Sequence, residues 1–244
     1  MIGLITGSGF YDLPDLIDRQ VVRIGTDYGD VDVTKGRLGD TSVGFLARHG
    51  SAHSIPPHAI NYRANIAALK KCGAEAVLAT AVSGAIDPTL KPGQFVVISD
   101  FIDFTNGRPD TFFDETGGGV THTDMSAPYS ATLRASILQA AATHNIDIVD
   151  GGVYCCTNGP RFETAAEIAM MSRAGGTLVG MTGYPEVALA NELDMAYASI
   201  GVVSNPAAGL GLERLSADDL FAVVRDCSEP LHQLIAAVVA DWTP

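Results

Sequence analysis

The chain has 244 residues, of which 18% are charged, and its formal net charge is −13. This length suits one α/β domain with a sizeable core, and so much negative charge argues against a protein that binds nucleic acid. No apolar run approaches the ~20 residues of a membrane span, and the four cysteines show no metal-ligand spacing. We therefore expect a cytoplasmic protein with reduced thiols, no metal site and no membrane partner.

Short apolar runs alternate with helical patterns in the first half of the chain. Strands are expected at 1–5, 31–38, 42–47, 76–82 and 95–100, and a helix at 59–72. Residues 103–128 form a long irregular excursion rich in Thr, Asp, Gly and Phe. A loop of that length in a compact domain is usually functional or interfacial.

The second half continues the alternation. Helices are expected at 131–143, 164–174, 185–192 and 216–240, with Ser216 as the cap of the last one, and strands at 152–156, 178–181 and 196–203. The pattern predicts an α/β fold: a single domain over residues 1–244 with a central mixed β-sheet flanked by helices.

Two short motifs carry a carboxylate and a side-chain amide. Glu163 lies in Gly-Pro-Arg-Phe-Glu-Thr at 159–164, and Asn205 lies in Ser-Asn-Pro-Ala at 204–207. A carboxylate accepts from a ring N–H but repels a bare ring nitrogen, whereas an amide donates and accepts at once. Hypoxanthine and guanine offer N1–H, O6 and a protonated N7, and adenine does not. If the two side chains converge, they form a site for a 6-oxopurine.

Three further positions suit an anion. Glycines around Ser8, at 7–9, let backbone N–H groups converge, although a plain tight turn is the alternative and the dinucleotide fingerprint is incomplete. Arg48 has a planar fork that suits phosphate, and His49 beside it can donate to another oxygen, unless the pair is merely structural. Thr182 follows a strand, where it suits an oxyanion or a helix cap. Glu186 is either a helix-dipole glutamate or an acceptor for a ribose hydroxyl.

Several longer motifs carry a family resemblance. They read Phe-Leu-Ala-Arg-His-Gly at 45–50, Ile-Pro-Pro-His-Ala-Ile-Asn-Tyr-Arg-Ala-Asn at 55–65, Gly-Pro-Arg-Phe-Glu-Thr-Ala-Ala-Glu at 159–167 and Val-Gly-Met-Thr-Gly-Tyr-Pro-Glu at 179–186. The chain resembles the trimeric nucleoside phosphorylases, which include methylthioadenosine phosphorylases and 6-oxopurine nucleoside phosphorylases. The likeness is closest to the methylthioinosine phosphorylase branch, through residues 121–129 and 205–209.

The resemblance implies a purine-salvage enzyme that needs no cofactor, uses inorganic phosphate as co-substrate and forms a homotrimer or a dimer of trimers. It implies that phosphate is bound by Ser8, Arg48, His49, the backbone at Ala81 and Val82, and Thr182. It implies that the nucleoside is bound by Phe162, Glu163, Met181, Asn205, Pro206 and Ala207, with a neighbouring subunit's His122 and with Ala217 near its 5′ end. Asn205 would be catalytic, because it would bind O6 and the N7 proton of the leaving base.

One departure from the family pattern bears on the substrate. Methylthioadenosine phosphorylases carry aspartate at the positions that match Asn205 and Ala207, where the two acids bind the adenine amino group and protonate N7. An amide and an apolar residue favour a 6-oxopurine instead, with 5′-methylthioinosine first. Alternatives are a methylthioadenosine phosphorylase that tolerates Asn205, an inosine or guanosine phosphorylase, a nucleoside-binding module without activity and, least supported, a nicotinamide oxidoreductase.

Overall fold

The computed structural model describes the chain except residues 51, 115–118, 212–216 and 243–244 and the side chains of residues 217–219. Its centre is a mixed sheet of eleven strands in the described part, ordered β2-β3-β4-β1-β5-β10-β9-β7, with β11 beside β5 and β6, and β8 beside β6. The strands are β1 (Ile2–Thr6), β2 (Ile17–Thr26), β3 (Gly29–Leu38), β4 (Thr41–Ala47), β5 (Ala76–Ala85), β6 (Phe95–Val97), β7 (Asp100–Asp103), β8 (Ile148–Asp150), β9 (Val153–Cys156), β10 (Leu178–Gly180) and β11 (Ala196–Pro206).

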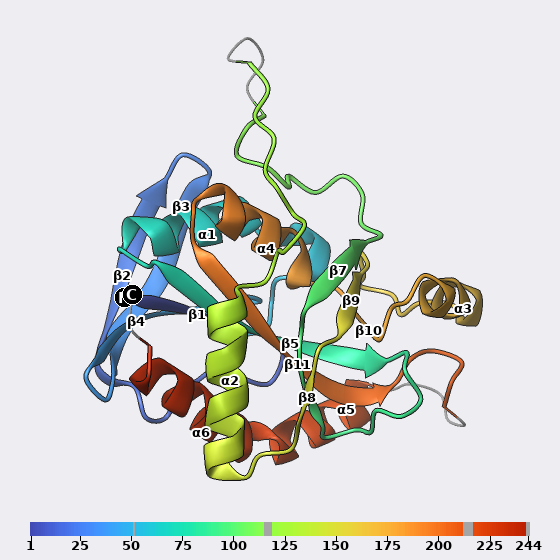
Figure 1. Cartoon of the computed structure of the whole chain (residues 1–244). Helices are drawn as coiled ribbons and strands as arrows, with labels where there is room; N and C mark the ends of the chain where they lie inside the picture. Colours follow the sequence, from blue (N-terminus) through green and yellow to red (C-terminus); the bar gives the residue numbers. More distant parts are fainter. Residues whose placement is uncertain (51, 115–118, 212–216, 243–244) are drawn as a thin grey trace.

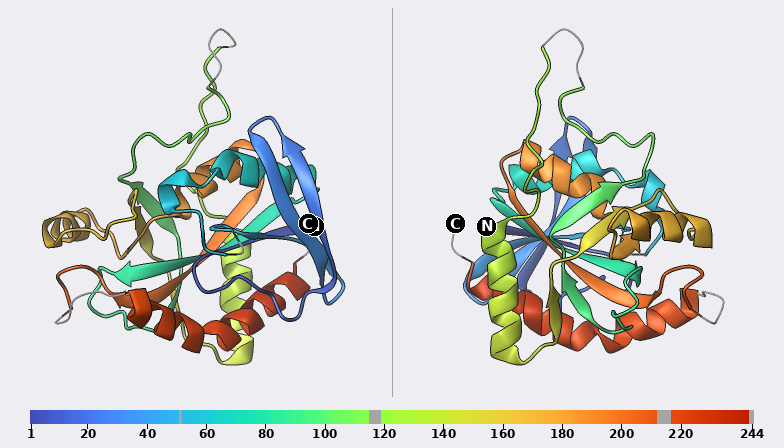
Figure 2. Two further views of the ribbon diagram at one scale, coloured as in Figure 1. Left: turned by 180° about the vertical axis from the view of Figure 1, so that it is seen from behind. Right: turned by 45° about the vertical axis from the view of Figure 1, so that its right-hand side comes forward.

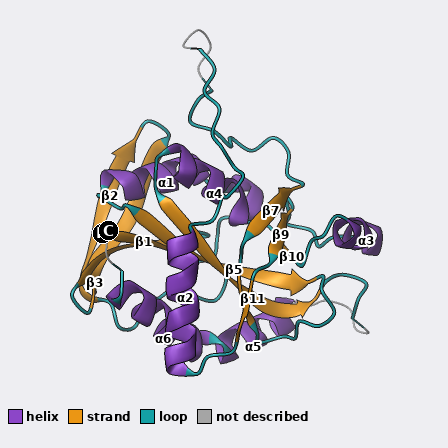
Figure 3. Ribbon diagram, viewed as in Figure 1, coloured by secondary structure: helices purple, strands orange, loops and turns teal. Residues whose placement is uncertain are grey.

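Helices cover both faces of this sheet (Figures 1 and 3). They are α1 (Tyr62–Lys71), α2 (Ala131–His144), α3 (Ala165–Arg173), α4 (Gly183–Glu192), α5 (Ala217–Asp226) and α6 (Ser228–Ala240). Helices α1 and α4 pack on one face and α2 and α6 on the other, while α3 lies apart at one edge (Figure 2). The predicted α/β fold with a mixed sheet is confirmed.

Strand β5 shows why the sheet is buried on both sides. Val77 and Ala79 belong to the core under α1 and α4, whereas Ala76 and Leu78 belong to the core under α2 and α6. Successive side chains of a strand point to opposite faces, and a parallel strand covered on both faces is apolar at nearly every position. Strand β5 pairs in parallel with β1 and with β11.

Several predicted boundaries are wrong for local reasons. The helix expected at 59–72 begins at Tyr62, because the side chain of Asn61 caps it by accepting from the Ala64 N–H. The strand expected at 95–100 is two strands, since β6 pairs with β11 and β7 with β9. The helix expected at 185–192 starts at Gly183, with a non-helical residue at Tyr184.

The helix expected at 216–240 is two helices, α5 and α6, which meet at Cys227. Pro230 explains the break, because proline lacks an N–H and its ring clashes with the carbonyl four residues earlier. The cap expected at Ser216 lies outside the described residues. No helix in the described part of the chain is long and apolar enough to cross a membrane.

Candidate active site

A cavity of about 410 Å³ opens where β1, β4, β10 and β11 reach their carboxyl ends beside β5. Crevices at the carboxyl ends of strands are the usual ligand sites of α/β sheets. Many of the residues predicted from the sequence line it: Ser8, Arg48, His49, Val82, Phe162, Glu163, Met181, Thr182, Asn205 and Ala207.

Four predicted residues are not among those that line the cavity. Ala81 is buried in β5, and Pro206 ends β11 and turns its carbonyl to Asn205. His122 lies exposed on the excursion between β7 and α2, which projects from the body of the fold (Figure 1). Ala217 begins α5, but its side chain is outside the part that the structure describes.

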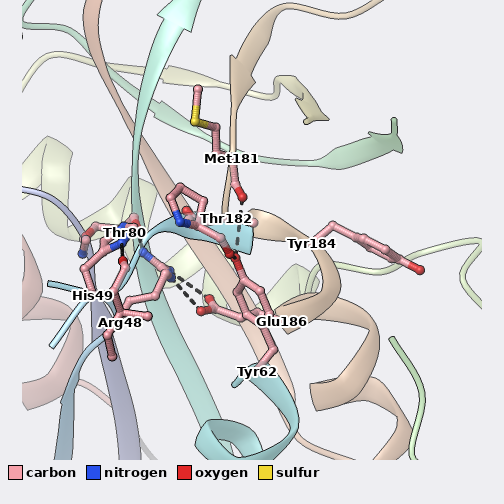
Figure 4. A network of polar contacts seen from close by, with 12 residues as sticks. Arg48, His49, Tyr62, Thr80, Met181, Thr182, Tyr184 and Glu186 are labelled. Atoms are coloured by element: carbon pink, nitrogen blue, oxygen red, sulfur yellow. Dashed lines mark hydrogen bonds and ion pairs between the residues drawn. The ribbon is translucent and has the colours of Figure 1, made fainter. Parts of the chain in front are cut away.

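Arg48 is buried beneath the cavity, with 2% of its surface exposed. Its Nε donates to Oε1 of Glu186 at 2.6 Å and its Nη2 donates to Oε2 at 2.8 Å, while Nη1 donates to the Thr80 carbonyl at 2.9 Å (Figure 4). The guanidinium therefore binds Glu186 through Nε and Nη2, and one N–H group on each of Nη1 and Nη2 remains without a partner among the described residues. Burial alone would lower the pKa of Arg48, but the charge of Glu186 raises it above its ordinary value.

Glu186 has no exposed surface and is not among the residues that line the cavity, which favours the helix-dipole interpretation over an acceptor for a ribose hydroxyl. It lies in the first turn of α4, as the helix-dipole interpretation requires, and it also accepts from the Tyr197 hydroxyl at 3.0 Å. Its carboxylate and the guanidinium of Arg48 cancel in formal charge. An anion in this part of the cavity would therefore be held mainly by neutral donors.

His49 lies beside Arg48, and its Nδ1 is 2.8 Å from the carbonyl oxygen of Ile55. A carbonyl only accepts, so Nδ1 carries the proton, and in the neutral ring Nε2 is an acceptor. Burial lowers the pKa of His49 to about 4, with help from the charge of Arg48 and against the bond to Ile55. At neutral pH His49 thus offers an acceptor where the sequence suggested a donor.

Thr182 occupies the N-cap position of α4 but makes no side-chain capping bond. It is 7% exposed and lines the cavity, so its hydroxyl is available to a bound ligand. Next to it, β5 pairs with β1 only as far as Ala79 and with β10 only from Gly84. Residues 80–83 therefore leave a stretch of sheet edge that neither neighbour covers, and Val82 of this stretch lines the cavity.

Asn205 lies at an irregularity of β11, where the register with β5 shifts. Its Oδ1 accepts from the Ser204 hydroxyl at 2.7 Å, and its Nδ2 donates to the Pro206 carbonyl at 2.6 Å. These two bonds fix the orientation of the amide and leave one further acceptor position and one further N–H. Asn205 therefore presents both halves of the pattern that a 6-oxopurine needs.

Glu163 lines the same cavity and is 9% exposed. Its Oε1 accepts from the Thr157 hydroxyl at 2.7 Å, which leaves the second oxygen for a ligand. Ala207 is 1% exposed and packs with Val179 in a small apolar cluster, so it contributes no polar group. The structure brings together the acid and the amide on which the base prediction depends.

Part of the remaining wall is apolar: α5 contributes Leu220, Phe221 and Val224, and the segment before α1 contributes Ile55, Pro56 and Pro57. Opposite them, the His53 ring contacts Phe221 edge-on, and its Nδ1 lies 2.7 Å from the Tyr11 hydroxyl. The family resemblance placed the start of this helix, at Ala217, near the 5′ end of the nucleoside, but Leu220, Phe221 and Val224 were not named in advance. Within the described ranges, no three His, Cys, Asp or Glu side chains gather as a metal site would require.

The chain belongs to the phosphorylase superfamily, whose family model matches residues 1–240. It is 44% identical to a 6-oxopurine nucleoside phosphorylase of Pyrococcus furiosus, over 98% of this chain and 91% of that one. It is 43% identical to a "probable S-methyl-5'-thioinosine phosphorylase" of Pseudomonas syringae pv. tomato, over 97% of each chain. A solved methylthioadenosine phosphorylase from Schistosoma mansoni in complex with adenine matches with a TM-score of 0.93 and 33% identity, over 98% of this chain and 90% of that one. The family resemblance seen in the sequence is confirmed.

Proposed function

We propose that this chain catalyses phosphorolysis of a 6-oxopurine nucleoside, with 5′-methylthioinosine as the favoured substrate. The products are the free base and 5-methylthioribose 1-phosphate. The observation that carries the proposal is that Asn205 and Glu163 line one cavity together with Arg48 and Thr182. The names of the two sequence relatives, a 6-oxopurine nucleoside phosphorylase and a probable S-methyl-5'-thioinosine phosphorylase, agree with it.

Recognition of the base follows from the free positions on the two side chains. The remaining N–H of Asn205 donates to O6, its Oδ1 accepts from N7–H, and the free oxygen of Glu163 accepts from N1–H. Adenine presents a bare N1 to the carboxylate and an amino group to the amide donor. Each unpaired buried group costs ~1–3 kcal/mol, so two mismatches disfavour adenine by roughly two to four orders of magnitude.

The reaction needs no cofactor in this proposal, because phosphate itself is the nucleophile. Ser8, Arg48, Thr182 and the uncovered edge of β5 hold it below C1′, and the sugar passes through an oxocarbenium-like state. The departing purine gathers negative charge on O6 and its five-membered ring. N7 takes up a proton from solvent as the C1′–N9 bond breaks, so that the base leaves neutral and Oδ1 of Asn205 accepts from the new N7–H. The bond from Nδ2 of Asn205 to O6 strengthens as the charge grows, and this is how binding energy lowers the barrier.

The apolar wall of α5 favours a methylthio group over a hydroxyl at the 5′ position. Leu220, Phe221 and Val224 offer a thioether burial, whereas His53 is the polar side chain nearby that suits a hydroxyl. An inosine or guanosine phosphorylase is thus the second candidate. A methylthioadenosine phosphorylase is supported by the likeness to the Schistosoma mansoni structure, but Ala207 lacks the acceptor that adenine would use.

We also propose a homotrimer, or a dimer of trimers, of single-domain cytoplasmic subunits. His122 lies on the projecting excursion, where Phe113 is 44% and Val120 is 82% exposed. Apolar side chains so exposed favour burial against another copy. In that assembly His122 would reach the 5′ end of a nucleoside in a neighbouring subunit.

A panel of nucleosides, each assayed for release of free base with and without phosphate, tests the proposal. We expect hypoxanthine from 5′-methylthioinosine only when phosphate is present, with slower release from inosine and much slower release from the adenine nucleosides. Release without phosphate would indicate a hydrolase. Binding of nucleosides without release in either condition would indicate a binding module and refute the proposal.

A further inference from the structure

Arg108 is a buried arginine that is not among the residues that line the cavity. It comes from the excursion between β7 and α2, and only 9% of its surface is exposed. Its Nη1 donates to the Tyr184 carbonyl at 2.6 Å, and its Nη2 donates to the carbonyls of Met181 at 2.8 Å and Thr157 at 3.1 Å. One guanidinium thus joins its own excursion to two segments, one that contains Thr157 and one that contains Met181 and Tyr184.

The charge of Arg108 is stabilised by carbonyl dipoles. Among the residues that the structure describes, no carboxylate forms an ion pair with it. Carbonyls in the loops that follow β9 and β10 have left the strand ladders and need other donors. A planar fork with five N–H groups can serve several of them at once, whereas the compact ammonium of a lysine cannot.

One of these bonds leads to the base end of the cavity. The backbone of Thr157 accepts from Arg108, and the hydroxyl of the same Thr157 donates to Glu163 at 2.7 Å. A second contact, to the Asn158 carbonyl at 3.2 Å, holds the following residue. Arg108 therefore fixes the position from which Glu163 meets the base.

The other bonds lead to the anion end. Met181 immediately precedes Thr182, whose hydroxyl faces the cavity, and Tyr184 lies two residues before Glu186, which holds Arg48 (Figure 4). Movement of the Met181 and Tyr184 carbonyls would displace both anion contacts together. Arg108 thus holds backbone segments at both the base end and the anion end of the cavity.

We propose that Arg108 is a positioning residue that sets the distance between the base and phosphate ends of the active site. The inference rests on the proposed phosphorolysis. Loss of Arg108 misaligns the nucleoside and phosphate relative to each other, which lowers kcat and raises KM for both substrates. A misplacement of about 1 Å can cost roughly a hundredfold in rate.

The experiment compares Arg108→Ala, Arg108→Lys and a control, Arg63→Ala, with the wild type. Arg63 contacts the same excursion, at the Thr111 carbonyl and Asp114, but its side chain does not line the cavity. Steady-state constants for 5′-methylthioinosine and for phosphate are measured at a temperature where each protein is folded by circular dichroism. The Arg108→Ala assay is repeated with guanidinium chloride below denaturing concentrations.

We expect both Arg108 variants to lose roughly a hundredfold in kcat and to show raised KM values for both substrates. Guanidinium should restore part of the activity of Arg108→Ala, whereas the lysine of Arg108→Lys should not substitute, and Arg63→Ala should match the wild type. If Arg108→Ala does not fold, Arg108→Lys decides alone.

Variants that lose thermal stability but keep kcat and both KM values would assign Arg108 a purely structural role and overturn the inference. A raised KM for one substrate only would overturn it as well, because the anchor would then serve one end. Failure of the proposed function is separate, since the wild-type protein would then release no base in the presence of phosphate.

Discussion

Replacement of Asn205 by aspartate tests the base recognition at its centre. The Nδ2 of Asn205 donates to the Pro206 carbonyl at 2.6 Å, and its second N–H is the donor assigned to O6. In Asn205→Asp an acceptor takes the place of this donor. The new oxygen then faces two acceptors, the Pro206 carbonyl and the O6 of the substrate.

The expected magnitude follows from the lost pairing. One unpaired buried group costs ~1–3 kcal/mol, which corresponds to roughly 5- to 150-fold in kcat/KM for 6-oxopurine nucleosides. The carboxylate gains an acceptor for the amino group of adenine, but Ala207, at 1% exposure, still offers nothing polar. The preference should therefore shift toward adenine only in part, and Asn205→Asp combined with Ala207→Asp should shift it further.

The assay mixes 5′-methylthioinosine and 5′-methylthioadenosine with phosphate and follows both bases by chromatography. Asn205→Ala, measured alongside, should lower the rate far more than it weakens phosphate binding, because the contact strengthens as the base departs. Near-native turnover of Asn205→Ala on 5′-methylthioinosine, or an unchanged product ratio for Asn205→Asp, would refute the role given to this residue.

Three further predictions concern the rest of the site. Glu186→Gln leaves the charge of Arg48 buried and unpaired, so the free energy of unfolding in denaturant should fall by about 3–5 kcal/mol, and a change near zero would show that the pair contributes little. Because the pKa of His49 is lowered from 6.5 to about 4, the unfolded chain binds a proton first as the pH falls below 6.5. Stability should then decline with falling pH by up to about 1.4 kcal/mol per unit until pH 4. His49→Asn should remove this part of the slope, and an unchanged slope would contradict the prediction. Val224→Ser makes the 5′ wall more polar, so the ratio of kcat/KM for 5′-methylthioinosine to kcat/KM for inosine should fall roughly tenfold. An unchanged ratio would contradict this prediction.

Much of the fold could be predicted, because in many elements the sequence pattern matches the burial of the residues in the structure. Strands β1 and β5 are continuous apolar runs, and α3 has both its cap at Thr164 and a capping box with Glu167. Strand β2 was missed because it is an edge strand in which no residue is fully buried, so its sequence shows no clear alternation. The break between α5 and α6 was missed although Pro230, which explains it, was visible in the sequence.

The site also contains residues that could be predicted from the sequence and residues that could not. Glu163, Thr182 and Asn205 could be named in advance, because each lies in a short motif at the end of a strand or in the loop after one. The partner of Arg48 could not, since Glu186 lies 138 residues away and meets it only through the sheet topology. Arg108 was equally hidden, because its function depends on carbonyl groups, which every residue carries and no sequence pattern marks.

The most direct test of the central claim is the ratio of kcat/KM for 5′-methylthioinosine and 5′-methylthioadenosine in the wild-type protein with phosphate. If the amide of Asn205 and the carboxylate of Glu163 bind one base together, the ratio should favour 5′-methylthioinosine by roughly two to four orders of magnitude. A ratio near one, or a preference for 5′-methylthioadenosine, would contradict the account.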